Sequence, residues 1–563
     1  MVRLVVATTV LAAVLPAFAQ NASNDCTSST DSDVRKLCQT VEQLRQLVTR
    51  QSLLLQQQQQ EIDALRRAQQ QSAPPEQAGA AATSAPAAVP MAPAIPLPAV
   101  GGQSDVVMSS VQGGEKQASG NPYPFEQESP LFLKIGGATF TPGGWIDFTS
   151  IYRTTDVGSG FTTALASIPF ANTVAGSVSE NRLTAANSRL SLRVDENIGK
   201  VKAYGYAEID FNGYLPGNAY VNTNSDSMRL RVFYLDLSAG KWDLLGGQSW
   251  SLLTPNRTGL SPFLSEIYNT VHLDTAYNAG IVYARQAQLR MVYHFTPGIA
   301  VGLSVENPEQ FSGSAVTFPA LFSTSETDTN SSSGSGGGTA TPNLHPDVIA
   351  KLAYDHKFGQ RTWHVEAAGL LTPVAIATAS TSSHASVEDR REGGGAALNM
   401  NLEVLPGLHL IADSFWSDGG GRYTGALGPQ FAVAQHGSVD APFTVQMVHS
   451  GAGLGGFEYQ LNRSTLLSLI YGGTYFSRVS SLDPSTNKLV GYGFVGSANS
   501  NNRYIQEGSF ATVTSIFHRP SYGSVQLITQ FSYIERTPWY VAPGMPRNAH
   551  LFENYVDIRY VLP

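Results

Sequence analysis

The second half of the chain alternates between very short and very long connections, and this alternation constrains the fold more than any other feature. The tight turns lie at Glu196–Lys200, Ala239–Lys241, Thr296–Gly298, Phe358–Gln360, Leu405–Gly407, Leu461–Arg463 and Arg519–Gly523, and the long polar loops include Thr155–Asn187, Thr254–Asn278, Asn307–Leu344 and Ser417–Val448. A membrane β-barrel gathers its short turns at one end and its long loops at the other. The alternation therefore predicts an all-β fold over residues 131–563: a transmembrane antiparallel β-barrel.

Apolar and polar residues alternate along the segments between these connections. Near the end of the chain, Val556, Ile558 and Tyr560 alternate with Asp557 and Arg559. A barrel wall with lipid outside and water inside gives this pattern, and so does a soluble β-sandwich with its apolar face inward. The loop asymmetry favours the barrel. The connections divide the region into about sixteen strands with both ends on one side, and barrels of this size leave an aqueous channel.

Aromatic residues near the expected strand ends also favour the barrel, because membrane barrels carry aromatic girdles at the two interfaces. These residues are Trp145, Tyr152, Tyr283, Phe295, Tyr354, Trp363, Tyr471, Phe476, Phe531 and Trp539. Charged residues make up only 14% of the 563 residues, whereas about 25% is usual for a soluble domain. The net charge of −8 leaves no basic footprint, so nucleic acid is not an expected partner.

Residues 1–19 have the three parts of a secretory signal peptide. Arg3 gives the positive start, Leu4–Leu15 the short apolar core, and Ala17-Phe18-Ala19 the small-residue cleavage site. The apolar run is short for a retained membrane anchor, which is the alternative. The only cysteines, Cys26 and Cys38, follow closely. They pair within one chain, pair between chains or stay free, and two cysteines do not decide among these states.

Residues 33–70 carry a seven-residue apolar repeat that predicts a periplasmic coiled coil. Its a positions are Val34, Val41, Val48, Leu55 and Ile62, and its d positions are Leu37, Leu44, Gln51, Gln58 and Leu65. Valine at a with leucine at d favours a dimer in the simplest scheme. A solitary amphipathic helix is the alternative. The Ala-, Pro- and Gly-rich residues 71–130 predict a disordered linker, and the stalk with its linker makes cell-wall contact one expectation.

The segment Leu230–Thr254 contains a strand, a tight turn and the sequence Leu-Gly-Gly-Gln-Ser-Trp at 245–250. This segment resembles the DcaP-like porins, as do Ser188-Arg189-Leu190, Glu208-Ile209-Asp210-Phe211 and the order of leader, coiled coil, linker and barrel. The resemblance implies a trimeric sixteen-stranded channel in a Gram-negative outer membrane, in contact with lipid and lipopolysaccharide. It also implies passive uptake of small, often anionic solutes, with the third long loop, Ser251–Asn278, folded into the lumen as a constriction.

We expect the polar faces of the strands to line this channel. The main candidates are Arg189, Arg193, Glu208 and Asp210, and the weaker ones are Arg229, Arg231, Gln248 and Arg290. Rows of opposite charge create a transverse field that selects solutes by charge, and a row of arginines favours carboxylate or phosphate groups. Each charge has an alternative role in an ion pair that holds the wall. The strand after Arg231 is apolar on both faces, which leaves its inward face ambiguous.

No catalytic motif accompanies these charges, and the histidines are scattered over different segments. We therefore expect neither enzymatic turnover nor a cofactor or metal. The sequence favours an outer-membrane porin for small hydrophilic solutes. The alternatives are a solute-specific channel for sugars or phosphate, a structural protein that tethers the envelope, and an outer-membrane hydrolase whose residues converge only in space.

Overall fold

A computed structural model describes residues 130–213, 227–263, 266–274, 276–312, 315–322, 345–378, 387–519 and 521–563. The chain divides into two units, Met1–Ala92 and Pro93–Pro563, and all described residues belong to the second. The predicted signal peptide, coiled coil and cysteines lie outside the described residues. So does the predicted linker, apart from Pro130.

Sixteen strands form one closed ring, which confirms the predicted strand number. Each strand pairs antiparallel with its neighbours, and the last strand closes the ring against the first along Trp145–Arg153. The ring strands, in order, are β2 (Ala138–Arg153), β4 (Arg189–Ile198), β5 (Val201–Asp210), β6 (Arg229–Ala239), β7 (Trp242–Trp250), β8 (Arg285–Thr296), β9 (Ile299–Glu306), β10 (Asp347–Phe358), β11 (Arg361–Thr378), β12 (Val387–Leu405), β13 (Leu408–Asp418), β16 (His449–Asn462), β17 (Thr465–Phe476), β20 (Asn502–Arg519), β21 (Gly523–Pro538) and β22 (Ala549–Val561).

In the described part of the chain, six shorter strands lie outside the ring, and the sequence pattern predicted none of them. β1 (Leu133–Ile135) and β3 (Glu180–Thr184) each pair with β2. The hairpins β14 (Phe431–Gln435)–β15 (Phe443–Met447) and β18 (Val479–Asp483)–β19 (Lys488–Tyr492) are built from long connections. Helical turns occur at η1 (Leu165–Ser167), α3 (Val174–Ser177) and η3 (Gly421–Tyr423). Among the described residues, no helix is long and apolar enough to span a membrane.

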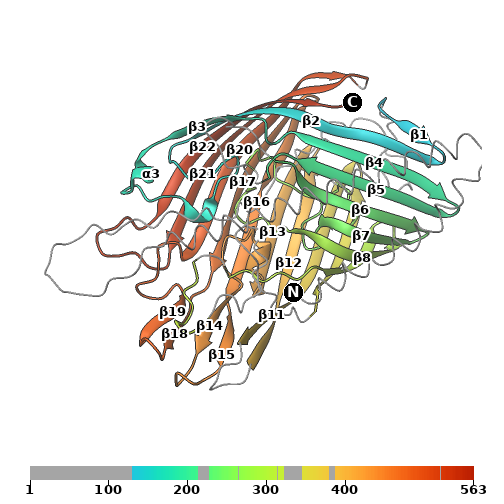
Figure 1. Ribbon diagram of the computed structural model, residues 1–563. Coiled ribbons are helices and arrows are strands. Elements are labelled where there is room, and N and C mark those ends of the chain that lie inside the picture. Colours follow the sequence, from blue (N-terminus) through green and yellow to red (C-terminus); the bar gives the residue numbers. More distant parts are fainter. Residues whose placement is uncertain are drawn as a thin grey trace, which may run out of the picture. The chain divides into compact units, whose positions relative to one another are not determined.

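Most short connections are two-residue hairpin turns, and in several of them a glycine takes a left-handed backbone. Gly240 (φ 64°) joins β6 to β7, and Gly359 (φ 64°) joins β10 to β11. Such turns need φ above zero, which glycine adopts without steric cost. The hairpins β14–β15 and β18–β19 lie beyond the end of the barrel where the long connections are (Figure 1). The predicted asymmetry of short turns and long loops is therefore present.

The outer wall is apolar and the inner face is polar. Ile146 and Phe233 are 64% and 62% exposed, whereas Asp147 between the outward residues of β2 is 1% exposed. This arrangement inverts that of a soluble sandwich and excludes that alternative for the described region. Most girdle candidates are exposed as predicted. Trp145, Tyr283, Phe476 and Trp539 are exceptions, because their side chains are half-buried or buried.

Candidate functional site: the barrel interior

An arc of ion pairs covers the inner wall from β4 to β6. Arg189 lies 3.4 Å from the Glu208 carboxylate, and Arg231 forms a close ion pair with the same carboxylate. Arg231 also lies 3.2 Å from Asp210, to which Arg229 donates two hydrogen bonds of 3.1 and 2.9 Å. The structure thus brings together five of the eight predicted site residues in one network.

The arc continues onto β2 and β22 through a tryptophan. The guanidinium carbons of Arg189 and Arg559 lie 4.3 and 4.8 Å from the Trp145 ring centre. Arg559 pairs with Asp147 at 2.8 Å and with Asp557 at 3.0 Å. Sequence reasoning missed Arg559 and Trp145 as site residues. The signal that could have found Arg559 is the alternation of apolar residues with Asp557 and Arg559, which places both charged side chains on the inner face.

A β-bulge decides which way the arginines of β6 point. On β5, Glu208 pairs with Val232 and the next residue, Ile209, pairs with Leu230, so Arg231 is the extra residue. A bulge shifts the side-chain alternation by one position. As a result Arg231 faces inward together with Val232 and Tyr234, while Phe233 faces outward. The bulge resolves the ambiguity of this strand.

The three remaining site candidates lie apart from the network. Arg193 is near the short-turn end of β4, where it pairs with Asp195 at 2.6 Å. Arg290 faces inward on β8 and donates to the Trp250 carbonyl and, at 3.0 Å, to Gln288. Gln248 was expected to line the channel, but its side chain points away from the lumen. It stands opposite Phe233 on the outward face, and its amide donates to main-chain carbonyls of β6.

The connection between β7 and β8, residues 251–284 and here called L3, lies inside the barrel. Its described part is held by hydrogen bonds to wall strands far from its own ends. The pairs are Leu252 N to Glu306 (2.8 Å), Asn256 N to Glu366 (3.2 Å), Arg257 to Glu458 (2.7 Å), Leu273 N to Gln530 (2.6 Å) and Ala279 N to Glu507 (3.0 Å). L3 therefore contacts β9, β11, β16, β21 and β20 in turn.

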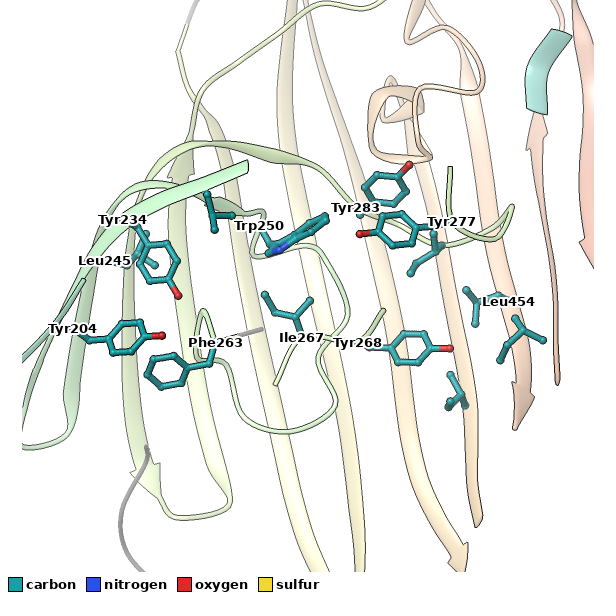
Figure 2. Packing of buried hydrophobic residues seen from close by; sticks show 14 residues of the cluster. Tyr204, Tyr234, Leu245, Trp250, Phe263, Ile267, Tyr268, Tyr277, Tyr283 and Leu454 are labelled. Carbon is teal, nitrogen blue, oxygen red and sulfur yellow. The ribbon is translucent and has the colours of Figure 1, made fainter. Parts of the chain in front are cut away.

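L3 also bridges opposite walls through an apolar cluster. In the ring, β6 and β16 have seven strands between them on either side. Tyr234 of β6 and Leu454 of β16 belong to one buried cluster, with Phe263, Ile267 and Tyr268 of L3 between them (Figure 2). At this level L3 therefore links the two walls across the lumen.

The packing of L3 also changes the surroundings of the predicted charges. Arg189, Glu208, Asp210 and Arg231 were expected to face water, yet their exposed fractions are 0%, 2%, 1% and 0%. Trp250, which is fully buried at the end of β7, has Arg231 and Arg285 over its ring at 6.0 and 5.3 Å. The arc therefore lies between the barrel wall and L3, covered from the lumen. The sequence pattern did not indicate that Arg285 and Trp250 belong to this site.

A second connection joins L3 inside the barrel. Residues 154–179, here called L1, leave β2 after Arg153, whose guanidinium donates to the Thr163 hydroxyl at 2.9 Å. The Thr163 backbone N–H donates to Asp274 of L3 at 3.1 Å. Burial raises the pKa of the Asp274 carboxyl. L1 and L3 thus pack as one layer against the wall.

The buried carboxyl of Glu266 in L3 should make the packing of L3 depend on pH. Burial, aided by the Asp355 charge and opposed by hydrogen bonds from Ser261 and by His294, raises the pKa of the Glu266 carboxyl to about 7. Between pH 4.5, the ordinary value, and about 7, the unfolded state is ionised while the folded state stays protonated. Stability therefore falls as pH rises through this window, by at most about 3 kcal/mol.

We expect L3 to resist protease more strongly at about pH 4.5 than at about pH 8. Glu266→Gln removes the ionisation while keeping the shape, so it should flatten the profile. Proteolysis of the purified protein at the two pH values measures this. An unchanged pH dependence in the variant would assign the effect to another group.

No protein-family profile matches the chain, and no curated protein matches it. Among solved structures, the outer membrane channel DcaP of Acinetobacter baumannii aligns with 76% of this chain and 99% of its own, at 16% identity and a TM-score of 0.52. The chain has the fold of the DcaP channel. The predicted resemblance is therefore confirmed at the level of the fold.

Two further structures align less well. The anion-selective porin of Comamonas acidovorans has 12% identity and a TM-score of 0.41, over 75% of this chain and 99% of its own. OprB of Pseudomonas putida has 10% identity and a TM-score of 0.40, over 75% of this chain and 94% of its own.

Proposed function

We propose that this protein is an outer-membrane porin through which small hydrophilic solutes diffuse without chemical turnover. The observation that carries the proposal is the closed sixteen-stranded barrel with an apolar outer wall and a charged inner wall. A closed barrel satisfies all its backbone hydrogen bonds internally, so an apolar wall of this kind is suited to lipid. L3 narrows the passage.

We also propose a local preference for anions at the arc behind L3, although carboxylates outnumber arginines among all buried residues of the described chain. Five guanidinium groups, from Arg189, Arg229, Arg231, Arg285 and Arg559, stand with four carboxylates, from Asp147, Glu208, Asp210 and Asp557. An excess of positive charge in a low-dielectric wall attracts anions. The guanidinium fork also fits carboxylate and phosphate groups.

Single-channel recording in a planar bilayer tests this function. We expect discrete conductance steps. Under a salt gradient, we expect a reversal potential whose sign shows that anions carry more of the current than cations. Folded protein that inserts but never conducts would reject the porin. A cation-selective current would reject the anion preference alone.

A solute-specific channel is the second candidate, and the packed interior favours it. A lumen in which L3 joins opposite walls leaves less room for general diffusion than an open ring would. Conductance that saturates with one sugar, phosphate or carboxylate would favour this candidate. Conductance that rises in proportion to every salt would favour general diffusion.

We also propose a homotrimer whose coiled coil, residues 33–70, extends into the periplasm. The sequence repeat supports the stalk, and lipid and lipopolysaccharide would surround the barrel. Deleting residues 33–70 should leave conductance intact if the stalk serves assembly or cell-wall contact. Crosslinking before and after the deletion reports the number of subunits.

A further inference from the structure

A groove runs along the outer wall of β16, β17, β20, β21 and β22. It has a volume of about 640 Å³ and is lined by exposed rings, among them Phe457, Tyr471, Phe510, Phe531 and Phe552. Gly508 forms part of its floor, because it stands between Tyr471 and Tyr533 in the strand register. The missing side chain leaves a hollow in an otherwise continuous apolar wall.

A polar row lies immediately above the groove, toward the long-loop end of the barrel. The Tyr471 hydroxyl donates to Gln506 at 2.6 Å, and the Tyr533 hydroxyl donates to Glu535 at 3.0 Å. A second hollow of about 210 Å³ begins at Tyr471 and continues upward past Gln506. Apolar surface thus gives way to hydroxyl, amide and carboxylate groups along the barrel axis.

Two arginines lie at the top of this surface. The guanidinium carbons of Arg478 and Arg503 lie 5.1 and 4.7 Å from the Trp539 ring centre, and Arg503 also lies 4.8 Å from that of Tyr504. Both arginines are exposed, and no described carboxylate lies within 4 Å of either. The Trp539 N–H donates to the Phe476 carbonyl at 3.0 Å, which fixes the ring beneath them.

The groove and the two arginines are separated along the barrel axis. Tyr475 stands opposite Tyr504, four residues above Tyr471, and four residues of strand span about 14 Å. From the groove upward the order is apolar, then hydroxyl and amide, then guanidinium. Acyl chains, linking polar groups and phosphates follow this same order from the middle of a membrane leaflet to its surface.

We propose that this surface binds a phosphorylated, multiply acylated glycolipid of the outer leaflet. Its acyl chains occupy the groove at Gly508, and its phosphates contact Arg478 and Arg503. Arginine is suited to phosphate because its fork donates two hydrogen bonds at once. Stacking on tryptophan orients the cation at little cost in lost freedom. The proposal rests on the proposed outer-membrane location, and it adds a specific site on the outer wall.

Bound lipid A on the purified full-length protein tests the site. We expect wild type to retain about one bisphosphorylated lipid A per chain in native mass spectrometry. The double variant R478Q/R503Q should lose most of it, and Gly508→Leu should lose it too. A side chain at Gly508 has room, because its first atom would meet only Tyr471 at 3.7 Å.

Matched controls place the same changes elsewhere on the wall. Arg463→Gln removes an exposed arginine at a short turn, and Gly369→Leu adds a side chain on the outward face of β11, where nothing lies within 4 Å. Both should retain lipid A. Titration with dephosphorylated lipid A and with inorganic phosphate separates the two halves of the ligand, and only the intact lipid should bind tightly.

Three results would overturn the proposal. Equal retention of lipid A in wild type and both site variants would reject the site. Tight binding of inorganic phosphate alone would reject the lipid. Loss of subunit association in the site variants with bound lipid unchanged would assign the groove to a second copy of the chain. Conductance is expected to persist in all these variants, so failure here is distinguishable from failure of the porin function.

Discussion

Gly472→Ala is expected to raise single-channel conductance several-fold, because the added side chain pushes L3 away from the wall. Gly472 faces inward on β17, and an added side-chain carbon would lie 2.2 Å from the Ala279 carbonyl oxygen. That distance is too short for any contact, so L3 must shift away from β17. Planar-bilayer recording measures the conductance, and protease cleavage within residues 251–284 reports the release of L3.

Gly369→Ala is the matched control for this experiment. Gly369 lies on the outward face of β11, and an added carbon there meets nothing within 4 Å. Its conductance and protease pattern should match those of wild type. If Gly472→Ala releases L3 to protease and conductance stays the same, L3 does not limit permeation.

Arg231→Gln is expected to destabilise the barrel by about 3–5 kcal/mol, the usual cost of removing one partner from a buried ion pair. Arg231 is fully buried and contacts both Glu208 and Asp210. Its loss leaves two buried carboxylates with one arginine fewer between them. The free energy of unfolding in urea, measured in lipid vesicles, reports the change.

The double variant R231Q/E208Q should recover part of this loss, since it removes one of the stranded carboxylates. Arg193→Gln serves as the control, because Arg193 is 20% exposed and its partner Asp195 is 39% exposed. Surface pairs of this kind contribute at most about 1 kcal/mol. Equal losses for Arg231→Gln and Arg193→Gln would contradict the burial argument.

The filled interior follows from contacts between segments that are distant in sequence. The resemblance to the DcaP-like porins implied that the third loop enters the barrel, and the structure places L3 there. The sequence did not predict that Tyr234 and Leu454, which are 220 positions apart in number, share one cluster with L3. Their apolar character suits an outward position equally well, so the pattern along the chain carried no signal.

The sequence by itself determined the barrel. Alternation of side chains along each strand, glycine at turns such as Gly240, and the alternation of short and long connections are local properties, and local geometry is enough to specify antiparallel neighbours. Only the tertiary structure decided the interior. The bulge at Arg231 sets which face of β6 points inward, and the anchoring of L3 sets whether the charges meet water. The bulge depends on the register between β5 and β6, and the anchoring of L3 depends on strands far from it in sequence. The alternation along the chain specifies neither.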